Sequence, residues 1–251
     1  MRYKIEGGSL PVVTIELNRG ESIFTQSGGM SWMSGGIDMD TNMKGGFLGG
    51  LGRMFTGESL FLATYTSRGE GQQIALASSF PGSIIALEIG PGREFICQKS
   101  SFLCATPGVN LSVEWMRRVG AGLFGGDEEA LEHILQHEGK REASDDAAIE
   151  DTVINHGGQG LAFLEIDGHV VEKTLAPGEQ LKVNTGNVAA FESSVRYNIE
   201  TVKGFKNVLF GGEGLFLTVL TGPGRVWLQT ISMPEFAQKI IPFLPTPSSG
   251  N

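Results

Sequence analysis

Apolar and polar residues alternate in the same register along three stretches of this chain. Each stretch starts 17 residues after a glycine, and these glycines are Gly20, Gly92 and Gly178. The positions on the inward side are Ile37, Met39 and Thr41, then Val109, Leu111 and Val113, then Val195, Tyr197 and Ile199. Alternation with a period of two is typical of a β-strand that buries one face. The pattern therefore predicts three equivalent strands.

Other features recur at fixed distances from the same three glycines. Small or turn-forming residues stand eight and nine positions further on, which predicts a tight hairpin at 28–29, 100–101 and 186–187. A phenylalanine before a glycine-rich turn follows in each copy, at Phe55, Phe124 and Phe210. We therefore predict an all-β chain of three tandem copies of one unit. The three units are 1–81, 82–166 and 167–233.

The middle copy carries an insertion of about 20 residues that the other two copies lack. The extra stretch, about 127–156, is acidic, and four apolar residues between Ala130 and Leu135 could form one narrow stripe. This predicts a short helix followed by a polar loop. Beyond the third copy, Pro234 suits a first helical turn and Pro242 would end the helix. Residues 234–251 are therefore predicted to form a short C-terminal helix and a disordered tail.

Composition and charge narrow the classes of function. The 251 residues carry a formal net charge of −9, and an acidic surface repels phosphate backbones, so general nucleic-acid binding is disfavoured. No apolar run approaches the roughly 20 residues that span a bilayer, and the N-terminus lacks the pattern of a signal peptide. We therefore expect a cytoplasmic protein, and its two cysteines fit a reducing compartment.

A triplicated β unit leaves strand edges that need partners. Each unit must bury a face that one copy could not bury alone, and unpaired edges are an aggregation hazard unless another strand covers them. Pairing with a second subunit is the usual solution. The repetition therefore predicts a homo-oligomer rather than a monomer.

Several motifs occur in an order that resembles a known family. They are Gly-Gly-Met-Ser-Trp-Met at 28–33, Gly-Leu-Ala-Phe-Leu-Glu-Ile-Asp-Gly at 160–168 and Phe-Gly-Gly-Glu-Gly-Leu-Phe-Leu at 210–217. The chain looks like the mitochondrial biogenesis family named for altered inheritance of mitochondria, over about 1–126 and 157–245. The resemblance implies short double-stranded β-helix units similar to the tryptophan RNA-binding attenuation protein, assembled as trimers. It brings no catalytic residues, and the stretch near 127–156 departs from it.

Histidines near the insertion are the candidates for a metal site. His133 and His137 are four residues apart, so on a helix they would share one face, and His156 lies beyond them. The alternative is a solvated helix, which we favour because two ligands alone do not make a specific site. A cupin-like enzyme needs histidines on facing strands, and only His169 lies at a predicted strand. We therefore expect no cofactor.

Cys97 and Cys104 lie symmetrically about the predicted turn at 100–101. If that turn closes a hairpin, the two side chains face each other and could form a redox-switchable disulfide. The alternative is two small buried hydrophobic residues, which we favour in a reducing compartment.

A glycine-rich loop at 44–53 presents Phe47, Leu48 and Leu51. It lacks the Gly-Lys-Ser/Thr signature of a phosphate-binding loop. One interpretation is a loop that contacts a membrane or a partner. The other, which we favour, places the three side chains in the core or in a subunit contact.

Three functional hypotheses remain. The first is a non-enzymatic, homo-oligomeric β-ring that acts as a scaffold or binding protein. The second is binding of RNA or a small ligand, which rests on similarity of fold alone. The third is a metal-dependent, cupin-like enzyme that uses His133, His137 and His156, and we regard it as the weakest.

Overall fold

The structure is a computed structural model that describes residues 1–26, 29–41, 62–115, 150–154, 159–201 and 216–243. Within these residues the chain forms nineteen β-strands, one α-helix and short 3-10 helices. All strand pairs are antiparallel. The all-β prediction is therefore confirmed for the described residues.

Two of the four sheets contain ten strands, β1–β8, β10 and β13. The first sheet has the order β1 (Arg2–Glu6), β2 (Val12–Leu17), β7 (Gln72–Ala77) and β4 (Trp32–Met33). The second has the order β5 (Ile37–Asp40), β6 (Leu62–Ser67), β3 (Ser22–Gln26), β10 (Phe102–Ala105), β13 (Gly160–Asp167) and β8 (Gly82–Ile89).

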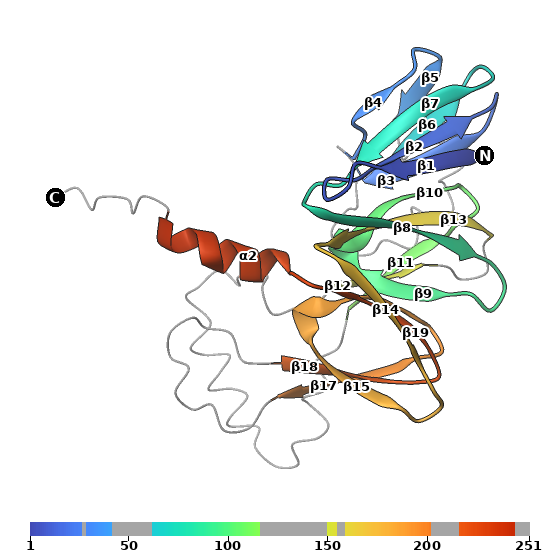
Figure 1. Ribbon diagram of the computed structural model, residues 1–251. Helices are drawn as coiled ribbons and strands as arrows, with labels where there is room; N and C mark the ends of the chain where they lie inside the picture. The colour runs from blue at the N-terminus through green and yellow to red at the C-terminus, as the bar shows by residue number, and fades with distance from the viewer. Residues whose placement is uncertain (27–28, 42–61, 116–149, 155–158, 202–215, 244–251) are drawn as a thin grey trace, which may run out of the picture.

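Two further sheets contain the other nine strands. The third sheet has the order β11 (Leu111–Trp115), β12 (Glu150–Ile154), β9 (Phe95–Gln98), β16 (Val188–Glu192), β19 (Gly224–Gln229) and β14 (Val170–Leu175). The fourth has the order β15 (Gln180–Asn184), β18 (Phe216–Thr221) and β17 (Arg196–Thr201). Figure 1 shows β4 and β5 at one end of the molecule and β15, β17 and β18 at the other.

One pairing order recurs in each third of the chain. Taking six strands in each third, β2–β7, β8–β13 and β14–β19, the first strand pairs with the sixth and the second with the fifth. The third strand also pairs with the sixth, and the fourth with the fifth. Strand β1 precedes the first group of six strands and pairs with β2, so it is an extra strand. Counting in the first third therefore begins at β2, and β3 is its second strand.

Neighbouring thirds are joined by one further type of pair. The second strand of one third pairs with the third strand of the next, as β3 with β10 and β9 with β16. We call these two pairs the internal junctions. Each six-stranded sheet consequently contains half of its strands from one third and half from the next.

The alternation of apolar and polar residues and the backbone conformation of glycine explain the local structure. Along β2, Val13, Ile15 and Leu17 are fully buried while the residues between them are partly exposed, as a half-buried strand requires. The anchors Gly20, Gly92 and Gly178 have φ of 80°, 73° and 79°, a left-handed conformation that favours glycine. The strands predicted after these anchors correspond to β5, β11 and β17, but Met39 of β5, expected on the inward side, is exposed.

The predicted hairpins at 100–101 and 186–187 are wrong. A 3-10 turn connects β9 to β10 (η3, Lys99–Ser101) and β15 to β16 (η5, Thr185–Asn187). The two strands on either side of each turn belong to different sheets and do not pair. The chain therefore turns a corner between sheets, because both edges of β9 and β10 are already occupied by other strands. In the first copy, β3 and β4 also lie in different sheets.

The predicted insertion also needs one correction. Residues 150–154, expected in a polar loop, form β12 and pair with both β11 and β9. The β-branched run Thr152-Val153-Ile154 suits a strand. The helix predicted earlier in the insertion lies outside the described residues.

The C-terminal helix is confirmed as α2 (Met233–Ile240), and a 3-10 turn, η6 (Ile241–Phe243), follows it. Ser232 and Glu235 form a capping box at its start, and Pro234 occupies its first turn. The Phe236 ring packs 4.8 Å from the Phe80 ring, and Figure 1 shows α2 extending to the side of the sheets.

The core runs across the internal junctions. One buried cluster contains Phe24 of β3, Phe102 of β10, Cys97 of β9 and Ala190 of β16. The Phe24 and Phe102 rings stack with centroids 5.8 Å apart. Strands from different thirds of the chain thus share one hydrophobic core, which couples their stability.

Candidate functional site

Most of the candidate site residues from the sequence lie outside the described residues. This holds for the histidines His133, His137 and His156 and for the loop residues Phe47, Leu48 and Leu51. In the described part of the chain, no three histidine, cysteine or carboxylate side chains gather where they could hold a metal ion.

Cys97 and Cys104 form no disulfide, and both side chains are buried. Cys97 lies on β9, opposite Ala190, and Cys104 lies on β10, opposite Thr25. The two cysteines therefore occupy the two internal junctions rather than opposite sides of one hairpin. Burial raises the pKa of the Cys104 thiol, which disfavours the reactive thiolate.

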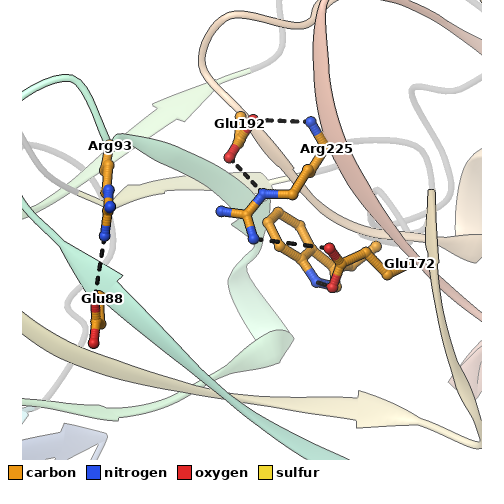
Figure 2. Close-up of polar contacts among 6 residues, drawn as sticks. Glu88, Arg93, Glu172, Glu192 and Arg225 are labelled. Atoms are coloured by element: carbon orange, nitrogen blue, oxygen red, sulfur yellow. Dashed lines mark hydrogen bonds and ion pairs between the residues drawn. The ribbon is translucent and has the colours of Figure 1, made fainter. Parts of the chain in front are cut away.

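A polar cluster forms around Arg225 of β19 (Figure 2). The Nε atom of Arg225 lies 2.8 Å from Oε1 of Glu192, and the Arg225 backbone N–H donates to the other oxygen of the same carboxylate at 2.9 Å. Glu172 Oε1 lies 3.7 Å from Nη1 of Arg225. The guanidinium also lies 5.0 Å from the ring centroid of Trp227, whose indole N–H donates to Glu172.

The Arg225 cluster links three strands electrostatically. Glu172 lies on β14, Glu192 ends β16, and Arg225 and Trp227 lie on β19. Because one arginine faces two carboxylates and an aromatic ring, its charge is satisfied locally. The arrangement is typical of a structural link. By contrast, the neighbouring pair Arg93–Glu88 in Figure 2 is a single contact of 3.1 Å between largely exposed side chains.

A second group of carboxylates lies at the end of β13. Burial raises the pKa of Asp167, the charge of Glu165 raises it further, and a backbone hydrogen bond involving Met233 opposes these effects. Glu165 accepts hydrogen bonds from the Ser78 hydroxyl and from the backbone and hydroxyl of Ser79. These contacts fix the link between β7 and β8 against β13.

Two strands, β4 and β15, each leave one edge unpaired within the described residues. The equivalent edges in the other thirds of the chain are paired. Strand β4 corresponds to β10 and β16 in the recurring pairing order. Its outer edge has no partner strand among the described residues. Strand β15 is the second strand of its third, and its outer edge is likewise unpaired within the described part. Their counterparts β10 and β16, and β3 and β9, are joined at the internal junctions.

Side chains at the unpaired edges are more exposed than side chains at the equivalent paired positions. Trp32 on β4 is 56% exposed, whereas Cys104 and Ala190, which stand 12 residues after their own anchor glycines as Trp32 does, are 0% exposed. Val183 on β15 is partly exposed, whereas Thr25 and Cys97, at the matching position, are buried. We call the outer edges of β4 and β15 the open edges.

The pattern of residues matches a known family over nearly its whole length. The family described as Mitochondrial biogenesis AIM24 matches residues 3–231. The chain belongs to this family. The resemblance proposed from the motifs is therefore confirmed.

Two proteins that resemble this AIM24 family member come from Streptococcus pyogenes. The chain is 27% identical over 257 aligned positions to "Uncharacterized protein M6_Spy0233" of Streptococcus pyogenes serotype M6, covering 99% of this chain and 93% of the relative. It is also similar in fold to the crystal structure of protein SPYM3_0169 from Streptococcus pyogenes, with a TM-score of 0.71 and 24% identity over 97% of this chain and 99% of the other. No helix in the described part of this AIM24-family chain has the length and apolarity that crossing a bilayer requires.

The sequence predicted strand edges in need of partners but did not locate them. A tryptophan at Trp32, where the other two copies hold a cysteine and an alanine, is a detectable signal. The exposure of that residue depends on which strand lies beside it, and this information comes only from the sheet order.

Proposed function

We propose that the protein is a homo-oligomeric β-ring that acts as a scaffold or binding protein without catalysis. The observation that carries the proposal is the pair of open edges, β4 and β15, at opposite ends of the described sheets (Figure 1). An exposed edge that ends a sheet is a template for another chain unless it is paired. A second copy supplies the partner strand at each open edge.

The recurring pairing order supports a tandem architecture within this proposal. The three units, 1–81, 82–166 and 167–233, are copies of one double-stranded β-helix-like fold, joined by the internal junctions. The first boundary falls in the link from β7 to β8, and the second lies at the end of β13, just before β14. The family resemblance favours a trimer, in which nine such units would complete a ring.

A scaffold accounts for the chemistry of the described residues better than an enzyme does. The Arg225 cluster is locally neutralised, and the buried Cys104 thiol is poorly suited to nucleophilic attack because burial raises its pKa. The net charge of −9 favours protein or small-molecule partners over nucleic acids. A cytoplasmic location is part of the same proposal.

Size-exclusion chromatography with light scattering tests the proposal on the full chain. We expect a single species at an integral multiple of the 26.8 kDa chain mass, with three copies as the favoured number. The mass should persist on dilution through the micromolar range. A strict monomer at micromolar concentration would overturn the proposal.

A further inference from the structure

Both internal junctions use the same register relative to the anchor glycines. The residue five positions after one anchor pairs with the residue 12 positions after the next anchor, and the residue four positions after pairs with the residue 13 positions after. In the structure these pairs are Thr25 with Cys104 and Phe24 with Ala105, then Cys97 with Ala190 and Ile96 with Phe191. The junction is therefore a repeated element with a fixed alignment.

From this register we infer that β15 of one copy pairs antiparallel with β4 of a second copy, with Val183 opposite Trp32 and Lys182 opposite Met33. The inference rests on the proposed assembly and specifies its interface. Val183 and Lys182 stand five and four residues after Gly178, and Trp32 and Met33 stand 12 and 13 residues after Gly20. One rule thus aligns two edges that neither internal junction uses.

The lengths of the two strands satisfy this rule. Strand β4 has two residues, and the internal junction between β3 and β10 also consists of two residue pairs. Strand β15 has five residues, which is enough to supply both partners. A short β4 is therefore no obstacle to the pairing.

The surfaces at the open edges are also compatible. Trp32 is 56% exposed, and Val183 and Leu181 pack from the edge of β15 onto the cluster that contains Leu220. The charge of Lys182 is directed to Glu200 on β17, at 2.6 Å, and therefore does not need a charged partner on β4. Covering Trp32 removes a large apolar side chain from water, which favours association.

The inferred contact joins two different edges and is therefore heterologous. A heterologous contact between identical chains generates a closed ring when the rotation per copy closes, whereas a twofold dimer would pair one edge with itself. The two open edges lie at opposite ends of the molecule in Figure 1, as a head-to-tail contact requires. The inference thus also predicts the symmetry of the assembly.

Disulfide trapping in the full chain tests the register. The variant Trp32→Cys/Val183→Cys should form inter-chain disulfides when an added oxidant removes the two thiol protons and two electrons, giving covalent dimers and larger species on non-reducing gels. Either single variant should stay monomeric on the gel. An off-register control, Met33→Cys/Val183→Cys, should cross-link much less, because neighbouring residues of a strand point to opposite faces.

An internal calibration comes from the native cysteine on β9. Ala190→Cys places a second thiol opposite Cys97 in the same register, so it should form a disulfide within one chain. Light scattering of each variant before oxidation shows whether the chain assembles. It therefore tests the assembly separately from the register of the contact. A multimer whose Trp32→Cys/Val183→Cys form yields only monomers on the gel would overturn the inferred register and leave the assembly standing. A monomeric native chain would overturn both.

Two further outcomes are decisive. Cross-linking of Val183→Cys or Trp32→Cys alone would indicate an edge paired with itself and would overturn the head-to-tail contact. Hydrogen exchange of the native protein, which needs no variant, should show slow exchange for amides of both β4 and β15 in the multimer. Fast exchange throughout both strands would overturn the inference even if the variants failed to fold.

Discussion

The internal junctions and the open edges use equivalent positions in opposite environments. Cys104 and Ala190 at the internal junctions are fully buried, whereas Trp32 at the open edge is 56% exposed. The internal positions hold small side chains that pack in the hydrophobic core, and the open position holds a tryptophan. The middle of the chain is thus completed by its own strands, and under the proposed assembly a second copy completes its two ends.

Burial at the two kinds of position contributes to two different free energies, that of folding and that of association. Burial at an internal junction contributes to the folding free energy of one chain, since the hydrophobic cluster there contains residues from all three thirds. Burial at an open edge contributes to association and depends on protein concentration. Equivalent substitutions at the two kinds of position should therefore act on different measurements.

The largest effect is expected at an internal junction. Cys104→Lys places an ammonium group at a fully buried position, and we expect a loss of at least about 3 kcal/mol in unfolding free energy. Urea denaturation followed by circular dichroism measures this loss. Cys104→Ala is the matched control, since alanine is the residue at the same position of the third unit, and it should cost only about 1 kcal/mol. Equal stability of the two variants would contradict the junction.

The equivalent substitution at the open edge should break assembly and spare the fold. Trp32→Lys removes apolar surface and adds a charge to the inferred contact, so the mass from light scattering should fall toward 26.8 kDa at micromolar concentration. The far-UV circular dichroism spectrum should not change. Met39→Lys on β5 is the control, because Met39 is similarly exposed, at 53%, but lies on a strand of a different sheet from β4 and β15. Loss of assembly in both variants, or in neither, would count against the proposed edge.

Local features of the chain could be predicted from the sequence, whereas the pairing of distant strands could not. Alternation and glycine anchors predicted the all-β class and the strands β5, β11 and β17, because these are local properties of the chain. The turns at 100–101 and 186–187 were also recognised, but the sheet that receives the next strand depends on distant partners. The sequence consequently suggested that Cys97 and Cys104 face each other across one hairpin, although they lie opposite Ala190 and Thr25.

A smaller effect should separate the Arg225 cluster from an ordinary surface pair. Arg225→Ala leaves Glu172 and Glu192 facing each other's charge without the guanidinium, so we expect a loss of about 1–2 kcal/mol in unfolding free energy. Arg93→Ala, which removes the exposed pair with Glu88, should change stability by less than about 0.5 kcal/mol. Urea denaturation of both variants provides the comparison, at a concentration where assembly is unchanged. Similar losses would mean that the cluster does not hold the last third of the chain together.

The smallest effect concerns the carboxylate of Asp167. Asp167 lies at the end of β13, and its backbone N–H donates to the Gln229 side chain of β19 at 3.4 Å. Burial and the charge of Glu165 raise the Asp167 pKa in the folded state, so the folded chain retains this proton to higher pH than the unfolded chain. The contribution of Asp167 to stability should therefore fall as pH rises from its unfolded pKa, near 3.9, through the raised folded pKa.

Replacing this carboxylate by an amide removes that dependence. Asp167→Asn should be more stable than the native chain at pH 7, by less than about 1 kcal/mol because the group is only half-buried, and the advantage should vanish at low pH. Urea denaturation across this pH range measures it. Glu165→Gln should move the window of the native Asp167 to lower pH without abolishing it, since burial is the larger cause of the shift. Superimposable pH profiles for the native chain and Asp167→Asn would show that the carboxylate of Asp167 contributes no pH dependence to the stability of the chain.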